Sequence, residues 1–302
     1  MKLLLIDGNS VIYRAYYATA NGDIMKTSTG VYTNAVYGFA NMLNKAIKMI
    51  KPDYIAVAFD KGKVTFRHKM YADYKAGRPE TPQELIDQMK LTREMLACYG
   101  IKYFGSDDYE ADDIIGSLAK KFDVEKCILS SDRDLWQLID DKTVVYAMHK
   151  GLSDFEKMDE AALKEKMGLT PSQIIDYKAL AGDKSDNIKG IDGIGDKTAV
   201  KFLNQFGSGE GLYEHIDEVK GKIKEKILNG REDFEISKKL ATIKTDVELD
   251  VKLEDLILDI NVDRCNRFYQ KYEMKSLIWN KDALKQKPNI ESEHDWVDDV
   301  DW

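Results

Sequence analysis

The stretch Tyr109-Glu110-Ala111-Asp112-Asp113-Ile114-Ile115-Gly116-Ser117-Leu118-Ala119 decides the fold. Its apolar residues recur every three to four positions, which is typical of a helix with one buried face. Three acids therefore stand in the first turn of a core-forming helix. The helix dipole favours acids there, but two carboxylates ~4 Å apart repel each other by roughly 4 kcal/mol at an effective dielectric constant of about 20. The stretch alone leaves two interpretations open, dipole complementation and a bound metal ion.

Three short apolar runs elsewhere in the chain each end in an aspartate. They are Lys2–Asp7, Tyr54–Asp60 and Cys127–Asp132. With helical segments between them, such as 34–50, they predict an α/β fold with a central, mostly parallel sheet flanked by helices. The carboxyl ends of parallel strands lie at one edge of the sheet, where such proteins bind ligands. A single terminal aspartate is commonly a helix N-cap, whereas three in register indicate a site.

Two more predictions concern the region around and after the third apolar run. Residues 143–148 are expected to add a strand. Asp134 follows Asp132 by two positions, so both would face the same crevice if the chain is extended there.

Residues 61–82 combine basic and aromatic side chains with weak apolar periodicity, and a helix is expected to begin after Pro82. Basic side chains between aromatic ones suit phosphate contact and base stacking. A mobile surface loop with solvated charges is the alternative, and this stretch alone does not exclude it. The residues concerned are Lys61, Lys63, Phe66, Arg67, His68, Lys69, Tyr71, Tyr74, Lys75 and Arg78.

From about residue 151 helical patterns dominate, with helices expected at 160–167, 171–180, 212–228 and 234–243. Asp183 and Asp186 are three positions apart, which places them on one side of a helical turn. The segment 190–198 resembles a P-loop, but Asp196 interrupts the pattern and no strand precedes it. A glycine-rich hairpin between two helices fits better, because glycine permits close approach and a helix start offers N–H groups to an anion such as a DNA phosphate.

The composition excludes several classes of protein. The 302 residues suffice for one large or two ordinary domains, and a hydrophobic content of 43% supports a sizeable core. Three scattered cysteines form neither a zinc motif nor a disulfide framework, which favours a reducing cytoplasm. The sequence contains no apolar run long enough to span a membrane, so no membrane partner is expected.

The net charge of −8 argues at first against a nucleic-acid partner. Six of the negative charges lie in the aperiodic tail after Pro288, and without them the net charge is −2. Setting aside nine candidate metal-binding acids as well leaves +7. A basic surface around an acidic pocket is compatible with a polyanionic substrate.

Eight short motifs, in this order, resemble those of the 5′-nuclease family, which includes the N-terminal domain of bacterial DNA polymerase I, phage 5′ exonucleases and flap endonucleases. The resemblance covers Met1 to about Leu284. It implies a structure-specific 5′-3′ exonuclease and 5′-flap endonuclease that hydrolyses DNA with two or more divalent ions. The motifs are Asp7-Gly-Asn, Ala58-Phe-Asp60, Phe66-Arg-His, Tyr74-Lys-Ala-Gly-Arg78, Tyr109-Glu-Ala-Asp-Asp113, Asp132-Arg-Asp134-Leu, Gly182-Asp-Lys-Ser-Asp-Asn187 and Gly190-Ile-Asp-Gly-Ile-Gly195.

The resemblance also assigns roles to residues. Arg14, Lys75 and Arg78 match basic positions that contact the scissile region. The basic stretch would be an arch that admits single-stranded 5′ DNA, with Arg67, Lys69 and Tyr74 as contacts. The hairpin resembles a helix-hairpin-helix element that grips duplex DNA, often with a bound K⁺, through Gly190, Gly193, Gly195, Lys197 and Thr198. The metal-binding acids would be Asp7, Asp60, Glu110, Asp112, Asp113, Asp132, Asp134, Asp183 and Asp186.

The chemistry of these residues agrees with that role. Phosphodiester hydrolysis needs an activated water and a stabilised leaving oxygen, which two ions ~4 Å apart supply. Many carboxylates without His or Cys indicate Mg²⁺ or Mn²⁺ and not zinc. We expect the first ion to be held by Asp7, Asp60, Glu110 and Asp112, the second by Asp132, Asp134, Asp183 and Asp186, and either one by Asp113.

Three other functions compete with this interpretation. A phosphatase of the haloacid dehalogenase type needs a second aspartate two residues after the first, where this chain has Asn9. A DNA-binding scaffold would leave nine acids without a purpose and would bind without metal. An RNA nuclease with a similar acidic pocket is the closest competitor, and the DNA-gripping hairpin speaks against it.

The expected organisation is an α/β nuclease core at 1–165, with the arch at about 61–98, a helical domain at 166–286 and an acidic, disordered tail at 287–302. We expect a cytoplasmic monomer that acts in replication and repair on DNA with 5′ ends or 5′ flaps, or on RNA–DNA primer junctions, beside a DNA polymerase. The acidic tail favours a stand-alone nuclease over a polymerase fragment.

Overall fold

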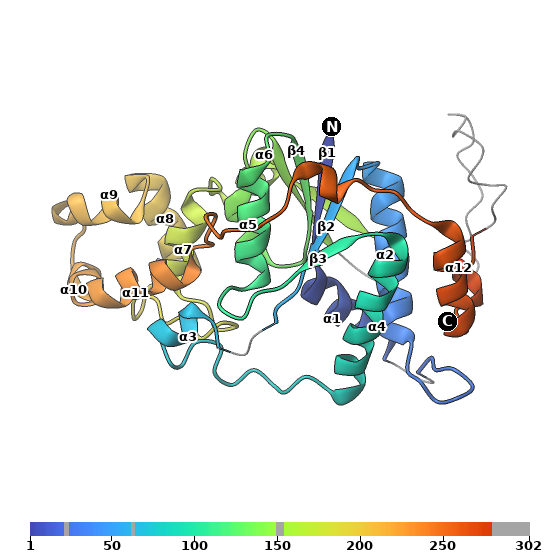
Figure 1. Cartoon of the computed structure of the whole chain (residues 1–302). Helices are drawn as coiled ribbons and strands as arrows, with labels where there is room; N and C mark the ends of the chain where they lie inside the picture. Colours follow the sequence, from blue (N-terminus) through green and yellow to red (C-terminus); the bar gives the residue numbers. More distant parts are fainter. Residues whose placement is uncertain (21–23, 62–63, 149–153, 280–302) are drawn as a thin grey trace.

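The computed structural model describes residues 1–20, 24–61, 64–148 and 154–279. Within these residues the strands form one six-stranded sheet in the order β3-β2-β1-β4-β5-β6 (Figure 1). Every neighbouring pair is parallel except β5 and β6. The mostly parallel sheet predicted from the sequence is therefore confirmed. The strands are β1 (Lys2–Asp7), β2 (Tyr54–Ala58), β3 (Lys102–Phe104), β4 (Glu125–Leu129), β5 (Thr143–Met148) and β6 (Phe155–Met158).

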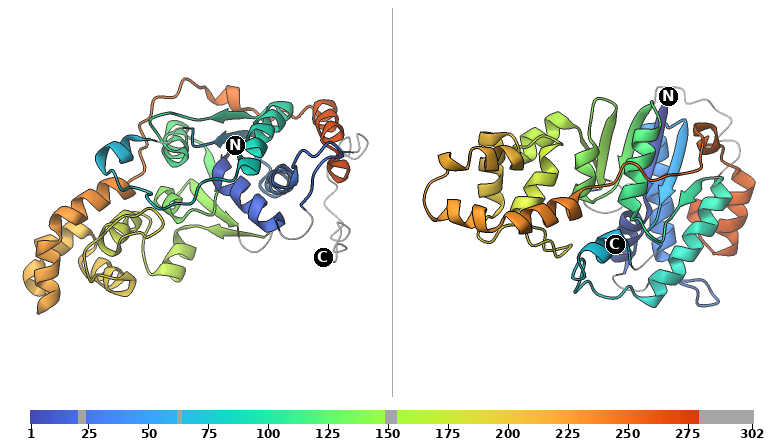
Figure 2. Two further views of the ribbon diagram at one scale, coloured as in Figure 1. Left: turned by 90° about the horizontal axis from the view of Figure 1, so that it is seen from below. Right: turned by 60° about the vertical axis from the view of Figure 1, so that its left-hand side comes forward.

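Helices cover both faces of this sheet, as Figures 1 and 2 show. Alternate residues of β1 point to opposite faces: Leu4 and Ile6 pack in one cluster, and Leu3 and Leu5 pack in the other. The first face is covered by α1 (Gly8–Thr19), α2 (Asn34–Ile50) and α4 (Gln83–Tyr99), and the second by α5 (Ala111–Lys121) and α6 (Glu160–Met167). All four β1 side chains are fully buried, which explains the uninterrupted apolar run.

A helical lobe lies beside the second face, at the left of Figure 1. It contains α7 (Gln173–Ala181), α8 (Asp196–Phe206), α9 (Gly209–Glu214), α10 (Lys222–Asn229) and α11 (Arg231–Ala241). The single helix predicted over 212–228 is wrong, because the chain breaks there into α9, the 3₁₀ turn η2 (Ile216–Glu218) and α10. Gly221, with φ of +74°, precedes α10 and favours this break.

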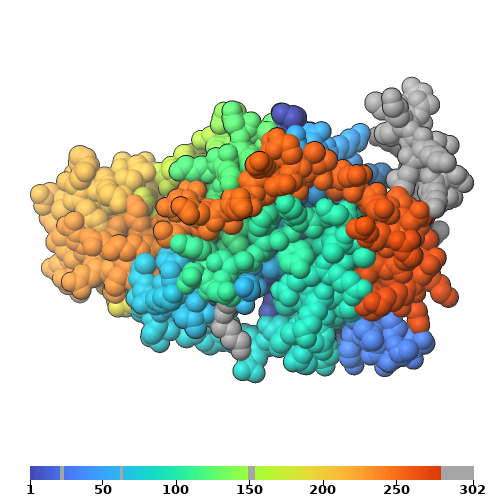
Figure 3. All heavy atoms as spheres, viewed as in Figure 1, coloured from blue at the N-terminus to red at the C-terminus, as the bar shows by residue number. Residues whose placement is uncertain are grey.

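After α11 the chain returns across the molecule through the 3₁₀ turn η3 (Leu253–Leu256) to α12 (Val262–Lys271) and η4 (Lys275–Leu277). Figure 3 shows this return segment as a band from the helical lobe to the opposite end of the molecule. There α12 packs against α4 and joins the core of the first face. The tail expected at 287–302 lies outside the described residues. No helix among the described ranges is both long and apolar enough to cross a bilayer.

The glycine-rich loop between α7 and α8 folds back tightly on itself. Gly190 has φ of +63°, and a Cβ added there would lie 2.3 Å from the backbone N of Gly182. Only glycine tolerates both the backbone conformation and this contact. Asp183 pairs with Ile188 in an antiparallel bridge, so Asp183 and Asp186 lie in a turn and not in the predicted helical turn.

Candidate active site

The sheet topology gathers acids from distant parts of the sequence. The three central strands β2, β1 and β4 are parallel, so their carboxyl ends share one edge. Asp7 is the last residue of β1, Asp60 follows β2 and Asp132 follows β4. Together with Glu110 and Asp112 at the start of α5 they line a cavity of about 520 Å³.

Hydrogen bonds hold these carboxylates in place. Asp7 accepts from the backbone N of Ser10 at 2.9 Å and from Oγ of Ser130 at 2.7 Å. Asp60 accepts from the backbone N of Ala111 at 2.8 Å, which fixes the first turn of α5 against the end of β2. This contact supplies an acceptor to a helix N-terminus from outside the helix. The two acids are therefore set by the local geometry of the strand ends.

The negative charge in the cavity is only partly compensated. Burial, with the nearby charges of Asp60 and Asp132, raises the pKa of Asp7 to about 7. Burial and the charges of Asp132 and Asp7 also raise the pKa of Asp112 well above its usual value. Burial raises the pKa of Asp132 although the cation of Lys178 opposes this shift. Such carboxylates favour a bound cation.

A second group of acids lies beside the first, around a cavity of about 710 Å³ lined by Asp132 and Asp183. The buried ammonium of Lys178, on α7, pairs with Asp134 and lies 2.6 Å from Asp183. Burial would raise the pKa of Asp183, but Lys178 and Ser185 outweigh burial and lower it to about 2. This group is therefore better compensated than the first.

Asp134 does not face the crevice as the extended-chain argument predicted. Asp132 instead caps the 3₁₀ helix η1 (Arg133–Leu138) by accepting from the backbone N of Asp134 at 2.8 Å. The helical geometry turns the buried Asp134 toward Lys178, and Asp134 does not line the cavity that holds Asp7. The alternation rule failed because the chain leaves the extended conformation at Arg133, between the two aspartates.

The segment after α3 (Phe66–Met70) bridges the two groups of acids. Lys75 Nζ lies 2.9 Å from Glu110, and Arg78 pairs with Asp186. The buried hydroxyl of Tyr74 lies 3.1 Å from both Glu110 and Asp186. Lys75 has a left-handed φ of +56°, which is costly for a non-glycine residue and is found mainly where surrounding contacts enforce it.

The remaining predicted cationic and hairpin residues do not line either cavity. Arg14 on α1 donates to Oγ of Ser131 at 3.4 Å. Lys69 is exposed and pairs with Asp108. Gly193, Gly195 and Lys197 are exposed and Thr198 is half-buried, at or before the start of α8.

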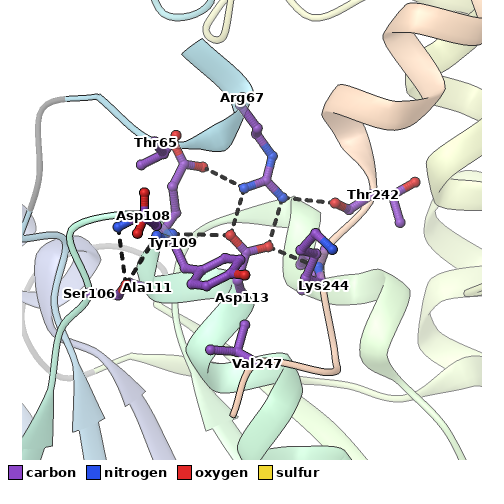
Figure 4. Close-up of polar contacts among 12 residues, drawn as sticks. Thr65, Arg67, Ser106, Asp108, Tyr109, Ala111, Asp113, Thr242, Lys244 and Val247 are labelled. Carbon is purple, nitrogen blue, oxygen red and sulfur yellow. Dashed lines mark hydrogen bonds and ion pairs between the residues drawn. The ribbon is translucent and has the colours of Figure 1, made fainter. Parts of the chain in front are cut away.

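Two predicted site residues form a buried pair behind the cavity. Asp113 and Arg67 are buried and bind each other, as Figure 4 shows. Neither lines the cavity that contains Asp7 and Asp112. Sequence spacing could not reveal this pairing, because the two residues are 46 positions apart.

Other residues at the site were not anticipated. Tyr13 and Tyr17 line the cavity from α1, and Lys178 approaches from α7. The tyrosines are four positions apart, which places them on one face of a helix. That spacing was visible in the sequence, but the direction of the face depends on how α1 packs. The role of Lys178 depends on a contact between lobes.

Among the described residues, no three Asp, Glu, His or Cys side chains are arranged to hold a metal ion as they stand. Several of the carboxylates form ion pairs with Lys75, Lys178 and Arg78 instead. The donors are nevertheless all oxygen and share excess negative charge, which fits a hard divalent cation. Binding would require these lysines and Arg78 to give way to the ion.

Two family models match this chain. Residues 2–168 match the N-terminal, resolvase-like domain of 5′-3′ exonucleases, and residues 169–263 match their C-terminal SAM fold. The chain belongs to the 5′-3′ exonuclease family. The family predicted from the sequence motifs is thereby confirmed, as is a C-terminal helical domain.

Relatives of this 5′-3′ exonuclease chain include DNA polymerase I of Streptococcus pneumoniae, which is 46% identical over 299 residues, 96% of this chain and 33% of the relative. DNA polymerase I of Bacillus subtilis is 50% identical over 259 residues, 84% of this chain and 29% of the relative. The chain thus spans about a third of the length of these relatives.

Solved structures share the fold. A T5 5′-exonuclease with bound divalent zinc ions superimposes with a TM-score of 0.67 at 21% identity, covering 90% of this chain and 98% of that one. The catalytic core of Rad2 in complex with a DNA substrate superimposes with a TM-score of 0.60 at 16% identity. The match covers 90% of this chain and 86% of that one.

Proposed function

We propose that this chain is a metal-dependent nuclease that hydrolyses phosphodiester bonds at the 5′ ends and 5′ flaps of DNA. The observation that carries the proposal is the cavity at the carboxyl edge of the sheet, where five acids meet the cation of Lys75 in a member of the 5′-3′ exonuclease family. The relatives are DNA polymerases, and the structural neighbours include nucleases with bound metal ions or DNA.

Mg²⁺ or Mn²⁺ fits the carboxylates better than a softer metal does, because the donors are oxygens without His or Cys. We propose that Asp7, Asp60, Glu110 and Asp112 hold one ion. Asp132 and Asp183, with Asp134 and Asp186 acting directly or through water, would hold the second. Bound divalent ions supply an activated water and stabilise the charge of the leaving oxygen.

The cations around the cavity would bind the substrate phosphate. Lys75, Arg78 and Arg14 lie near the acids and can form ion pairs with a phosphate that enters the cavity. In the free protein Lys75 forms an ion pair with Glu110, and Arg78 forms one with Asp186. This resting arrangement keeps both cations ordered before the substrate arrives, which lowers the cost of organising the site.

DNA on either side of the scissile bond would contact different parts of the chain. Lys69, in the segment between β2 and α4, would contact the single-stranded 5′ end. Tyr74, predicted as a second contact, is buried, and its hydroxyl is bonded to Glu110 and Asp186 instead.

The duplex would lie on the hairpin before α8, a helix-hairpin-helix element in this proposal, through Gly193, Gly195, Lys197 and Thr198, with K⁺ bound there as well. Gly190, predicted as a further contact, is buried, and its N–H donates to Ser237 Oγ at 3.1 Å. The start of α8 is exposed, and N–H groups at a helix N-terminus suit phosphate.

We also propose a biological setting for this activity. A monomer would act on 5′ flaps or RNA–DNA primer junctions in the cytoplasm beside a DNA polymerase, since the relatives carry this region within DNA polymerase I.

The proposal is tested by incubating the protein with a 5′-flapped duplex labelled on the flap strand, with Mg²⁺ or with EDTA. Cleavage near the flap junction in Mg²⁺ alone is expected. Tight binding of the flap without cleavage in either condition would contradict the proposal. A blunt duplex with a blocked 5′ end serves as the substrate control.

A further inference from the structure

Arg67 and Asp113 form a buried ion pair behind the cavity. Their exposed fractions are 2% and 0%. Arg67 Nη1 lies 2.7 Å from Asp113 Oδ2, and Nη2 lies 2.8 Å from Oδ1, so the pair is bidentate. This geometry is the strongest that arginine and a carboxylate adopt.

The guanidinium uses all five of its N–H donors. Besides the two bonds to Asp113, Nε donates to the carbonyl of Leu240 at 2.8 Å and Nη2 to that of Thr242 at 2.8 Å. Nη1 also lies 3.3 Å from Glu110 Oε2. Arg67 thus joins the segment before α4, the start of α5 and the end of α11 at one point, as Figure 4 shows for most of these contacts.

The carboxylate of Asp113 is equally occupied. Oδ2 accepts from the backbone N of Glu110 at 3.1 Å, and Oδ1 accepts from the backbone N of Lys244 at 2.8 Å. With the two bonds from Arg67 this makes four, which is about the number that a carboxylate can accept. No acceptor position of Asp113 is left for an ion in the cavity.

Glu110 connects this pair to the site. Its carboxylate is held by Arg67, by the hydroxyl of Tyr74 at 3.1 Å and by Lys75 Nζ at 2.9 Å. Building on the proposed function, we propose that Arg67 is a positioning residue that orients Glu110 toward the metal ion, and that Asp113 is its counter-ion and not a metal ligand. Arg67 is then not a DNA contact.

Lysine cannot replace Arg67 in this role. An ammonium has three donors and no planar fork, so it cannot satisfy Asp113, Glu110 and two carbonyls together. Partners that orient a metal ligand typically change metal affinity by about 10- to 100-fold when they are removed.

A double-mutant cycle tests the proposal, with Mn²⁺ binding to the free protein measured by calorimetry. Arg67→Lys and Asp113→Asn should each raise the Mn²⁺ dissociation constant by about tenfold without changing the number of ions bound. The double variant should be no worse than the poorer single variant within about twofold, because both changes break one pair. Loss of one bound ion in Asp113→Asn, or additive effects, would overturn the proposal.

A matched control comes from the far end of the molecule. Arg264 on α12 is exposed and donates to the carbonyl of Ala97 at 3.5 Å. Arg264→Lys should leave Mn²⁺ binding unchanged. If it raises the dissociation constant as much as Arg67→Lys does, the effect is not specific to this pair and the proposal fails.

A measurement on the unmodified protein covers the case in which the variants do not fold. The backbone N–H of Lys244 bonds to Asp113, so its hydrogen exchange reports whether that carboxylate moves. Saturating Mg²⁺ should leave this exchange rate unchanged. Exchange at least tenfold faster with Mg²⁺ would show that Asp113 leaves Lys244 for the ion. Neither readout requires cleavage, so failure of the flap assay remains a separate result.

Discussion

At the residue scale, Asp112 is the side chain whose surroundings most favour a bound cation. Burial and the charges of Asp132 and Asp7 raise its pKa well above the ordinary value. It lies in the first turn of α5 but makes no N-cap bond there, since the capping contacts belong to Glu110 and Asp113. The dipole alone therefore does not account for this acid.

Asp112→Asn should lower flap cleavage in Mg²⁺ by on the order of 10³-fold, because metal-supplied stabilisation is worth several kcal/mol. Binding of the uncleaved flap in EDTA should be unchanged or tighter, since a negative charge near the phosphate is removed. Single-turnover rates and fluorescence anisotropy measure the two quantities. A loss of binding that matches the loss of cleavage would contradict this role.

The sequence allowed the acids at strand ends to be predicted, because alternation and strand polarity are local properties. It could not separate Asp112 from its neighbour Asp113, whose partners Arg67 and Lys244 come from distant segments. Asp134 was misplaced for a related reason, since its orientation follows from a 3₁₀ turn that the periodicity did not reveal.

At the scale of elements, the glycine loop before α8 carries a strict backbone requirement. Gly190→Ala should lower the free energy of unfolding for two reasons. Left-handed backbone strain costs about 1–2 kcal/mol, and overpacking against Gly182 costs about 1–3 kcal/mol. Gly168, in the left-handed region with φ of +71° and with its nearest neighbour 3.7 Å from an added Cβ, is the matched control, and Gly168→Ala should cost only the strain. Denaturant unfolding compares them. Equal losses of stability would contradict the close packing of Gly190.

The short helix α3 should respond to pH through His68. Burial lowers the pKa of His68; the charge of Glu110 opposes this shift, but Lys75 and Arg67 add to it, so the pKa stays below its usual value. Neutral His68 accepts from the backbone N of Thr65 at 3.2 Å. Because the unfolded chain binds the proton more tightly, this stabilisation is present above pH ~6.5 and is lost as the pH falls below it.

Hydrogen exchange of the Tyr71 amide, which bonds to the carbonyl of Arg67 at 2.8 Å, measures this effect. After correction for intrinsic exchange, its protection should fall between pH 7 and pH 5. The pH dependence should vanish in His68→Gln. If His68→Gln keeps it, another group is responsible.

Elements with a clear helical period and strands of five or more residues with an apolar run were predictable, and the shortest strands were not. The helices at 34–50 and 160–167 and the strand at 143–148 were predicted at the bounds observed. The strands β3 and β6, of three and four residues, show too little periodicity to be recognised from sequence and owe their conformation to pairing with β2 and β5.

At the scale of the whole molecule, the candidate site is shared between two lobes. The sheet edge supplies Asp7, Asp60 and Asp132, and the helical lobe supplies Asp183 and Asp186. The segment containing Tyr74 and Arg78 spans them, and the return segment in Figure 3 closes the chain over α5. The packing of α12 on α4 was not predictable, because its contacts link residues 167 positions apart.

The most direct test of the account is to locate the ions by anomalous diffraction from crystals soaked in Mn²⁺. The account predicts anomalous density in the cavity at the carboxyl edge of the sheet, within coordination distance of Asp7, Asp60 or Asp112, and none beside the Arg67–Asp113 pair. Absence of density in this cavity at saturating Mn²⁺, or an ion bound to Asp113 in place of Arg67, would contradict it.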